Sequence, residues 1–160
     1  MADTDQAAAG NGGEKKIIQP QKIYIKDISF ESPNSPGIFT QDWKPNVDID
    51  IDNKSAVLAE DLHEVVLTLT VTAKVGENTA FLAEVHQAGI FVMRGLDAEQ
   101  VRRIQNVFCM RTLYPYACAA LSDIVTKGGF PQLLLTPVNF EGLYAQRQQA
   151  AATQSETSES

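Results

Sequence analysis

The segment from Glu64 to Ala73 constrains the fold more than any other part of the chain, because apolar residues alternate strictly along it. Four apolar residues would share one face of an extended strand: Val65, Leu67, Leu69 and Val71. The opposite face would carry Val66 and three threonines. A helical period would scatter the four apolar residues around its axis. The pattern therefore predicts a half-buried strand that needs partner strands and a cover for its apolar face.

The region from Ile17 to Glu31 predicts a first strand with an irregularity. Ile23 and Ile25 would face one way in a regular strand, whereas Ile28 and Phe30 would face the other. One explanation is a bend or bulge near Lys26, and the other is a strand end that is covered on both faces. We expect the bend or bulge, because a regular strand would not change its apolar face midway.

Two further segments also favour strands. Residues 47–52 alternate valine or isoleucine with aspartate, and residues 53–55 are expected to turn or interrupt this strand. Residues 81–88, extended towards Met93, follow a tight turn at positions 76–79. Short connections between strands are typical of an antiparallel meander or Greek key.

The period changes to that of a helix at Asp97, which is a suitable N-cap. Thr112 is expected to cap a second helical segment that has Pro115 in its first turn, with a kink near Arg111. Asn139 can cap a last helix from Phe140 to about Ala151. The fold class is therefore α+β, a four-stranded antiparallel sheet with a kinked long helix and a C-terminal helix packed on one side.

Composition predicts one globular domain flanked by two tails. The chain has 160 residues, of which 44% are hydrophobic and 21% are charged. Residues 1–16 and 152–160 are small and polar, so we expect an N-terminal arm and an acidic tail, both disordered, around a domain at 17–151. The arm does not resemble a signal peptide, and no apolar run is long enough to span a membrane. The cytoplasm is the expected compartment.

The net charge of −7 argues against a nucleic acid as partner and favours a basic protein. No motif for phosphate binding, zinc binding or nucleophilic catalysis occurs. The histidines, His63 and His86, are expected to be ordinary polar residues, and the cysteines, Cys109 and Cys118, buried hydrophobes. Alternating aspartates at 48–52 lack the glycine and glutamate of a calcium loop. The sequence thus predicts neither an enzyme nor a cofactor.

Surface features remain as candidate sites. Asp27, Ser29 and Glu31 would share one face of the first strand, and Leu82 and Glu84 one face of the fourth, so an acidic patch results if these strands share a sheet. The aromatic pair Phe39 and Trp43 follows a turn at 32–37. These two rings either return to the core or line an apolar groove. Open sheet edges favour a homo-oligomer.

Several long motifs resemble the bacterial protein-export chaperone family SecB, in register over residues 20–145. They are the runs YIKDISFESP at 24–33, DW at 42–43, EVVL at 64–67, FPQL at 130–133 and PVNF at 137–140. The resemblance implies a cytosolic homotetramer, built as a dimer of dimers, that binds unfolded secretory precursors and delivers them to the translocase motor SecA. It implies no nucleotide, metal or membrane insertion.

The resemblance also implies roles for particular residues. The SecA-binding positions of the family correspond to Asp27, Glu31, Leu82 and Glu84. Positions that affect tetramer assembly correspond to Ala83, Val85 and Gln87, where the family often has cysteine in place of the alanine. The client groove corresponds more loosely to Phe39, Trp43, Val47, Ile49, Ile51, Phe140 and Leu143.

Two alternatives stay open at the level of the sequence. A holdase of the same fold could serve a partner outside the export pathway, such as an antitoxin. A different class of protein, a small-ligand-binding or enzymatic domain, could use Phe39 and Trp43 as a pocket.

Overall fold

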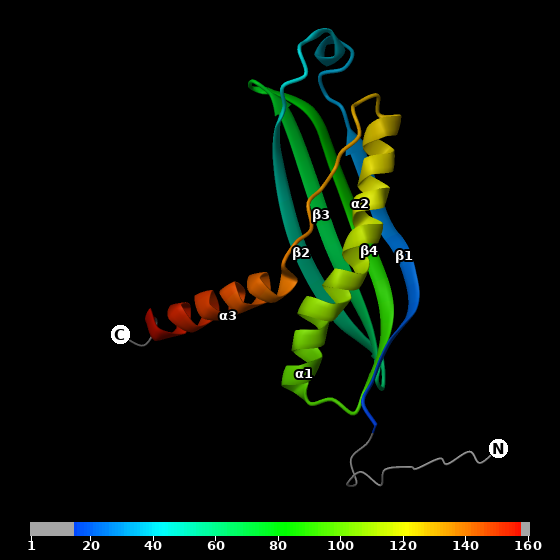
Figure 1. The fold of residues 1–160 in the computed structure, drawn as a ribbon, viewed down its shortest axis with the longest axis vertical. Coiled ribbons are helices and arrows are strands. Elements are labelled where there is room, and N and C mark those ends of the chain that lie inside the picture. The colour runs from blue at the N-terminus through cyan, green and yellow to red at the C-terminus, as the bar shows by residue number, and fades with distance from the viewer. Residues whose placement is uncertain (1–14, 158–160) are drawn as a thin grey trace, which may run out of the picture.

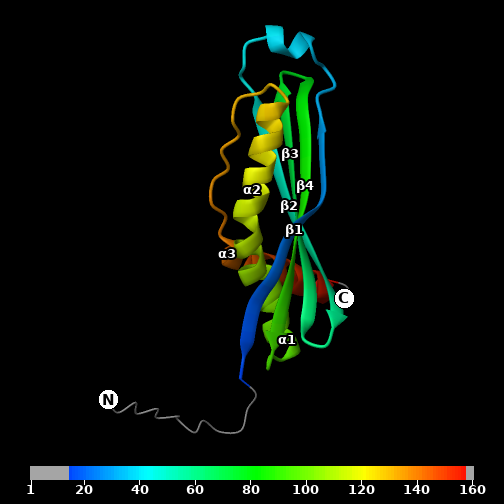
Figure 2. The same ribbon diagram turned by 90° about the vertical axis from the view of Figure 1, so that its right-hand side faces the viewer.

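A computed structural model describes residues 15–157, which form one sheet covered on one face by helices (Figures 1 and 2). The strands are β1 (Ile17–Glu31), β2 (Asn46–Ala59), β3 (Leu62–Val75) and β4 (Asn78–Arg94). All neighbours are antiparallel, in the order β1-β4-β3-β2. Strands β2, β3 and β4 follow one another as neighbours, and β1, joined to β2 by a long connection, lies beside β4. Of the two expected topologies, a meander and a Greek key, the structure has the Greek key.

The irregularity in β1 lies where the apolar pattern changes face. Ile25 is opposite Gln87 and Asp27 is opposite His86, so Lys26 is an extra residue in the ladder. This bulge confirms the expectation near Lys26. It places the isoleucines before it and Ile28 and Phe30 after it on the same, helix-covered face of the sheet. A second irregularity follows Pro20, which cannot donate to the ladder.

Strand β3 lies inside the sheet and supplies the centre of the core. Its predicted inward residues are all buried, and they pack with apolar side chains of β4 and of the long helix: Val65, Leu67, Leu69, Val71, Phe81, Val85, Leu113, Leu121 and Val125. Strand β2 runs without interruption through positions 53–55, so the expected turn there is wrong. Its side chains on that segment continue to alternate opposite β3.

The helical cover consists of α1 (Ala98–Arg103), a π-helical turn η2 (Ile104–Phe108) and α2 (Cys109–Lys127). Asp97 caps α1 as expected, in a reciprocal capping box with Gln100. The prediction of a new cap at Thr112 is wrong, because its hydroxyl donates to the Phe108 carbonyl within a continuous helix. Pro115 lies inside α2, and the irregular turn lies upstream of it at η2.

The last helix, α3 (Phe140–Thr157), leaves the sheet nearly sideways (Figure 1). The Asn139 side chain accepts a hydrogen bond from the Gly142 amide, which confirms the expected cap. Helix α3 continues beyond Ala151 through residues that were expected to form a tail. Positions 1–14 and 158–160 lie outside the described residues, so the arm and the end of the tail stay predictions, as does the division of the chain around a domain at 17–151.

Candidate functional site

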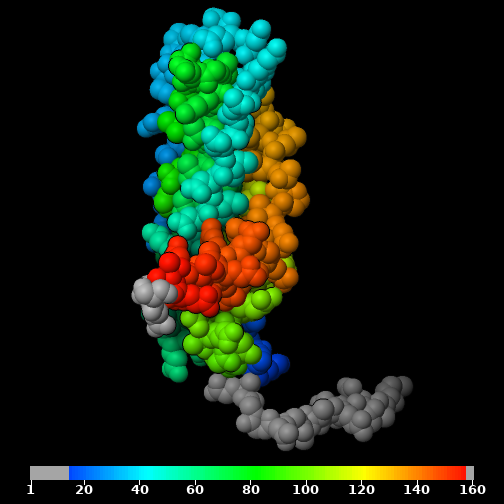
Figure 3. All heavy atoms as spheres, turned by 90° about the vertical axis from the view of Figure 1, so that its left-hand side faces the viewer, coloured from blue at the N-terminus to red at the C-terminus, as the bar shows by residue number. Residues whose placement is uncertain are grey.

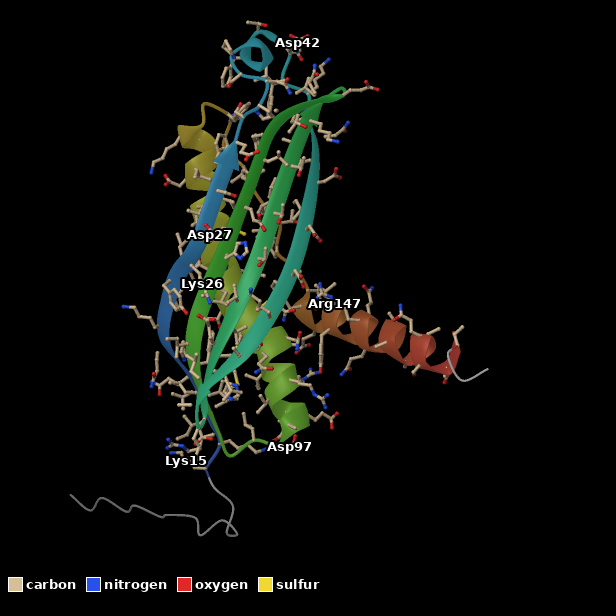
Figure 4. All side chains as sticks on the ribbon, turned by 180° about the vertical axis from the view of Figure 1, so that it is seen from behind. Lys15, Lys26, Asp27, Asp42, Asp97 and Arg147 are labelled. Atoms are coloured by element: carbon tan, nitrogen blue, oxygen red, sulfur yellow. The ribbon has the colours of Figure 1, made fainter. Side chains whose placement is uncertain are left out.

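The acidic patch forms on the face of the sheet that the helices do not cover. In the β1–β4 register, Asp27 lies opposite His86, Ser29 opposite Glu84 and Glu31 opposite Leu82. The expected SecA-binding residues, Asp27, Glu31, Leu82 and Glu84, are thus neighbours on two paired strands. Figure 4 marks Asp27 on β1 next to Lys26. Leu82 is 37% exposed, a large apolar side chain among carboxylates. The patch therefore combines negative charge with one apolar contact.

The acidic character continues across the sheet. Glu84 on β4 lies opposite Thr70 on β3, and Thr70 in turn lies opposite Asp50 on β2. The alternating aspartates of β2 therefore project from the same uncovered face as the patch. His86 is 3.1 Å from Glu84, measured from Nε2 to Oε1, and it adds a positive charge to this face only when protonated. The uncovered face is thus strongly acidic at neutral pH.

A polar cluster lies further along the same face. The Tyr24 hydroxyl and the Lys26 ammonium both donate to the Glu64 carboxylate, the latter at 2.8 Å. The hydrogen bond from Lys26, followed by that from Tyr24, holds the pKa of Glu64 below its usual value. Burial and the Glu64 carboxylate raise the pKa of Tyr24 to about 12. This cluster ties the edge strand β1 to β3 across β4.

At one end of the molecule Phe39 and Trp43 pack against Phe130. Their ring centroids lie 5.0 and 5.4 Å from that of Phe130, which is buried against Phe81. Phe39 nevertheless remains 50% exposed and Trp43 37%. The rings therefore pack on the core and still present apolar surface, and their place in a client groove stays a prediction.

The remaining groove residues extend this apolar surface along β2 to α3. Val47 and Ile49 are exposed on the helix side of the edge strand, and Ile51 is half-buried. Ile51, Phe140 and Leu143 line one narrow pocket together with Met110. In Figure 3 the crossover segment 128–139 (orange) runs beside β2 and above α3 (red). The expected groove residues are thus arranged along β2, from the rings of Phe39 and Trp43 at one end to α3 at the other.

Sequence reasoning missed several residues that shape this surface. Phe130 is the platform for the two exposed rings, and the Tyr114 hydroxyl fixes the crossover segment by donating to the Thr136 carbonyl at 2.7 Å. Arg147 of α3 donates to the Ile51 carbonyl at 3.0 Å. The apolar composition of residues 130–138 could have indicated that Phe130 packs on the core. No local pattern indicated that Arg147 contacts β2.

The residues expected to affect tetramer assembly are buried beneath the helices, unlike the exposed residues of the acidic patch. Ala83, Val85 and Gln87 lie on the helix-covered face of β4 and are at most 3% exposed. Gln87 donates to the Tyr24 carbonyl at 3.0 Å. In this chain the three side chains are buried, so their role in assembly stays a prediction.

His63 and Cys109, two of the residues considered for catalysis or metal binding, are both buried. His63 is buried with its Nδ1 3.3 Å from the Gln105 amide, and burial raises the pKa of Cys109 to about 12. Across residues 15–157, no three carboxylate, imidazole or thiol groups gather in a way that could hold a metal ion. None of the helices in that range is long and apolar enough to cross a membrane.

Comparison with known proteins identifies the family. A family model described as "Preprotein translocase subunit SecB" matches residues 11–151. Protein-export protein SecB of Nitrosococcus oceani is 51% identical over 149 residues, which cover 92% of this chain and 91% of that protein. Protein-export protein SecB of Ectopseudomonas mendocina is 50% identical over 149 residues, covering 91% and 92% of the two chains.

A solved structure supports the same fold. The SecB-like chaperone of Mycobacterium tuberculosis, in complex with a peptide from an antitoxin, superposes with a TM-score of 0.64 at 13% identity. The match covers 76% of this chain and 91% of that one. The fold and the family model agree with the high identity to the bacterial relatives, and the chain belongs to the SecB family.

Proposed function

We propose that this chain captures unfolded secretory precursors in the cytoplasm, keeps them competent for translocation and delivers them to SecA. Membership of the SecB family makes the chain a protein-export chaperone and not an enzyme. The observation that carries the finer proposal is the pairing of two surfaces on one protomer. Exposed apolar side chains along β2 form the proposed client groove, and acidic side chains lie on the uncovered face of the sheet.

The groove is suited to non-native polypeptide. Its apolar residues are exposed on an edge strand, whose main-chain groups are available to an extended segment. Aromatic and branched side chains contact many apolar residues without demanding a particular sequence. The net charge of −7 keeps a protein with such a surface soluble. The groove residues Phe39, Trp43, Val47, Ile49, Ile51, Phe140 and Leu143 are our candidates for client contact.

The acidic patch is our candidate for SecA docking. Asp27, Glu31 and Glu84 offer carboxylates to a basic partner, and Leu82 offers an apolar contact between them. The patch and the groove lie on different parts of the protomer, so both can be occupied together. Release of the client then needs no hydrolysis by the chaperone, because the docked motor can compete for it.

We also infer a homotetramer, a dimer of dimers. Strand β1 is the other edge of the sheet, and long edges are commonly covered by a second copy. Several grooves on one assembly let a long client bind at many weak sites, so avidity replaces strong single contacts. Ala83, Val85 and Gln87 would influence this assembly indirectly, through the packing of α2.

The alternative client class is a partner outside the export pathway, such as an antitoxin. The Mycobacterium tuberculosis structure resembles this chain in fold only, so it gives no preference for an antitoxin. Affinity purification of the chaperone with bound clients distinguishes the two roles. We expect the captured proteins to be enriched in precursors with signal peptides, and enrichment of one cytoplasmic partner without them would overturn the export role.

A further inference from the structure

Half of the main-chain groups on the edge strand β2 point away from the sheet. Beside β3, the Asp61 carbonyl accepts from the Met93 amide of β4 at 2.8 Å, so odd-numbered residues of β3 bond to β4 and even-numbered residues bond to β2. Even-numbered residues of β2 lie opposite those even-numbered residues of β3. The odd-numbered residues of β2, such as Val47 and Ile51, therefore direct their amides and carbonyls to the open side.

Two contacts close this open side at the middle of β2. The Arg147 guanidinium of α3 donates to the outward carbonyl of Ile51 at 3.0 Å. The outward amide of Asn53 donates to the Asp52 carboxylate at 2.8 Å. A strand added to β2 would lie about 4.8 Å from it, in the space that the Arg147 side chain occupies. Main-chain pairing therefore cannot continue past Ile51 while Arg147 is in place.

The position of Arg147 is fixed by contacts of α3 with the rest of the protomer. Its guanidinium also donates to the Asn53 amide oxygen at 3.5 Å, and the Asn53 side chain donates to that of Asn106 in η2 at 2.8 Å. At the start of α3, Glu141 accepts from Arg103 at 3.4 Å. Figure 4 shows Arg147 on the part of α3 that lies beside β2. The arginine is thus a fixed obstacle at the edge of the sheet.

Positions 47 and 49 lie on the open part of the edge. Within residues 15–157, no hydrogen bond uses the outward amide or carbonyl of Val47 or Ile49. Their side chains are 40% and 48% exposed, so this stretch offers apolar contacts and main-chain partners together. It is too short for a stable interface between two folded copies, whereas an unfolded chain can bind it as one of several weak sites. An extended client segment is therefore the occupant that fits this edge.

We propose that Arg147 sets the point at which main-chain pairing between the client and β2 ends. A client segment adds to the sheet as a further strand along residues 46–50, and it turns away at Ile51, where the guanidinium already occupies the carbonyl. The inference rests on the proposed client groove and adds to it the place and length of the paired segment. Client residues beyond this point contact the protomer through their side chains alone.

Residue-resolved amide hydrogen exchange by NMR tests this stop, with an unstructured apolar peptide as the client. When the peptide occupies about 90% of the grooves, exchange at a paired amide should fall about tenfold. In the unmodified protein we expect this slowing at Val47 and Ile49 and not at Ile51 or Ser55. In Arg147→Met, which keeps a long side chain without donors, we expect the slowing to extend to Ile51.

The matched control is Arg102→Met, because Arg102 lines the same hollow between α1 and α3 as Arg147. This variant should show the exchange pattern of the unmodified protein. Slowing at Ile51 in the unmodified protein, or the same pattern in Arg147→Met, would overturn the stop at Arg147. A peptide that binds in fluorescence anisotropy without slowing any amide of β2 would overturn the main-chain pairing and leave the client groove standing. Absence of binding would overturn the groove itself.

Discussion

Glu31 at the end of β1 lies directly opposite Leu82 on β4, so a carboxylate and an exposed leucine are neighbours on the uncovered face of the sheet. The β1–β4 ladder fixes this relationship, because a slip of one residue would turn one of the two side chains towards α2. The same ladder fixes Asp27 and Glu84 beside them. The acidic patch is therefore a direct product of the strand register.

A positive charge introduced into the patch should strongly weaken docking of SecA. Leu82→Arg or Glu84→Lys places a positive charge where a basic partner is expected, and we predict a loss of affinity of about tenfold or more by calorimetry. Client binding should be unchanged, because the groove is elsewhere. Asp50→Lys makes the same charge change on the far edge strand and serves as control. Unchanged affinity of the patch variants for SecA would remove these residues from the docking site.

A charge within the apolar groove should weaken client capture. Ile49 is exposed on the helix side of β2, so Ile49→Arg changes the surface without opening the core. We expect about tenfold weaker suppression of aggregation of an unfolded precursor, since the contact of one large apolar side chain is lost. Val57→Arg, also on an exposed part of β2, is the matched control. If the two variants suppressed aggregation equally well, Ile49 would not belong to the groove.

Enlarging Ala83 should affect stability and assembly together. The residue is 1% exposed beneath α2, so Ala83→Leu overpacks the core and is expected to cost about 1–3 kcal/mol of unfolding free energy. The displaced helix should also shift the protein towards smaller assemblies, measured by light scattering. Ala56→Leu, on the exposed edge strand, should do neither. Loss of assembly at full stability would instead place Ala83 directly in a subunit interface.

The Tyr24–Lys26–Glu64 cluster predicts two limbs in the dependence of stability on pH. The pKa of Glu64 is lower in the folded state, so its contribution is present above its ordinary pKa of 4.5 and is lost as pH falls below it. Tyr24 has a folded pKa of about 12 against an ordinary 10.0, so its contribution is lost as pH rises between these values.

Chemical denaturation at a series of pH values measures both limbs. Glu64→Gln should flatten the acidic limb relative to the unmodified protein, and Tyr24→Phe should flatten the alkaline limb. Lys22→Gln, on the same strand and outside the cluster, should leave both slopes unchanged. Identical pH profiles for all the variants would contradict the ionic role of this cluster.

Patterns within single elements predicted most of the fold. The change of apolar face in β1 revealed the bulge at Lys26, and Asp97 was recognisable as a cap by its position before a helical period. Pro115 is a misleading signal, because a proline favours the first turn of a new helix, whereas α2 continues through it. The length of α3 was underestimated although Ala150, Ala151 and Ala152 are strong helix formers.

Local sequence patterns predicted less of the candidate site than of the fold. The outer patch required only the alternation of two strands and the assumption that they pair. The groove depends on contacts between distant residues, such as Ile51 with Arg147 and Phe39 with Phe130, and no local period encodes those. The groove residues were therefore available only through the resemblance to the SecB family, and their role stays a prediction.

Light scattering of the purified protein, alone and with a reduced unfolded secretory precursor, measures whether the chain is a tetrameric chaperone that binds unfolded polypeptide. We expect a particle of four 17.5 kDa chains that gains the mass of the precursor and keeps it from aggregating. A monomer that forms no complex with the unfolded precursor would contradict this expectation.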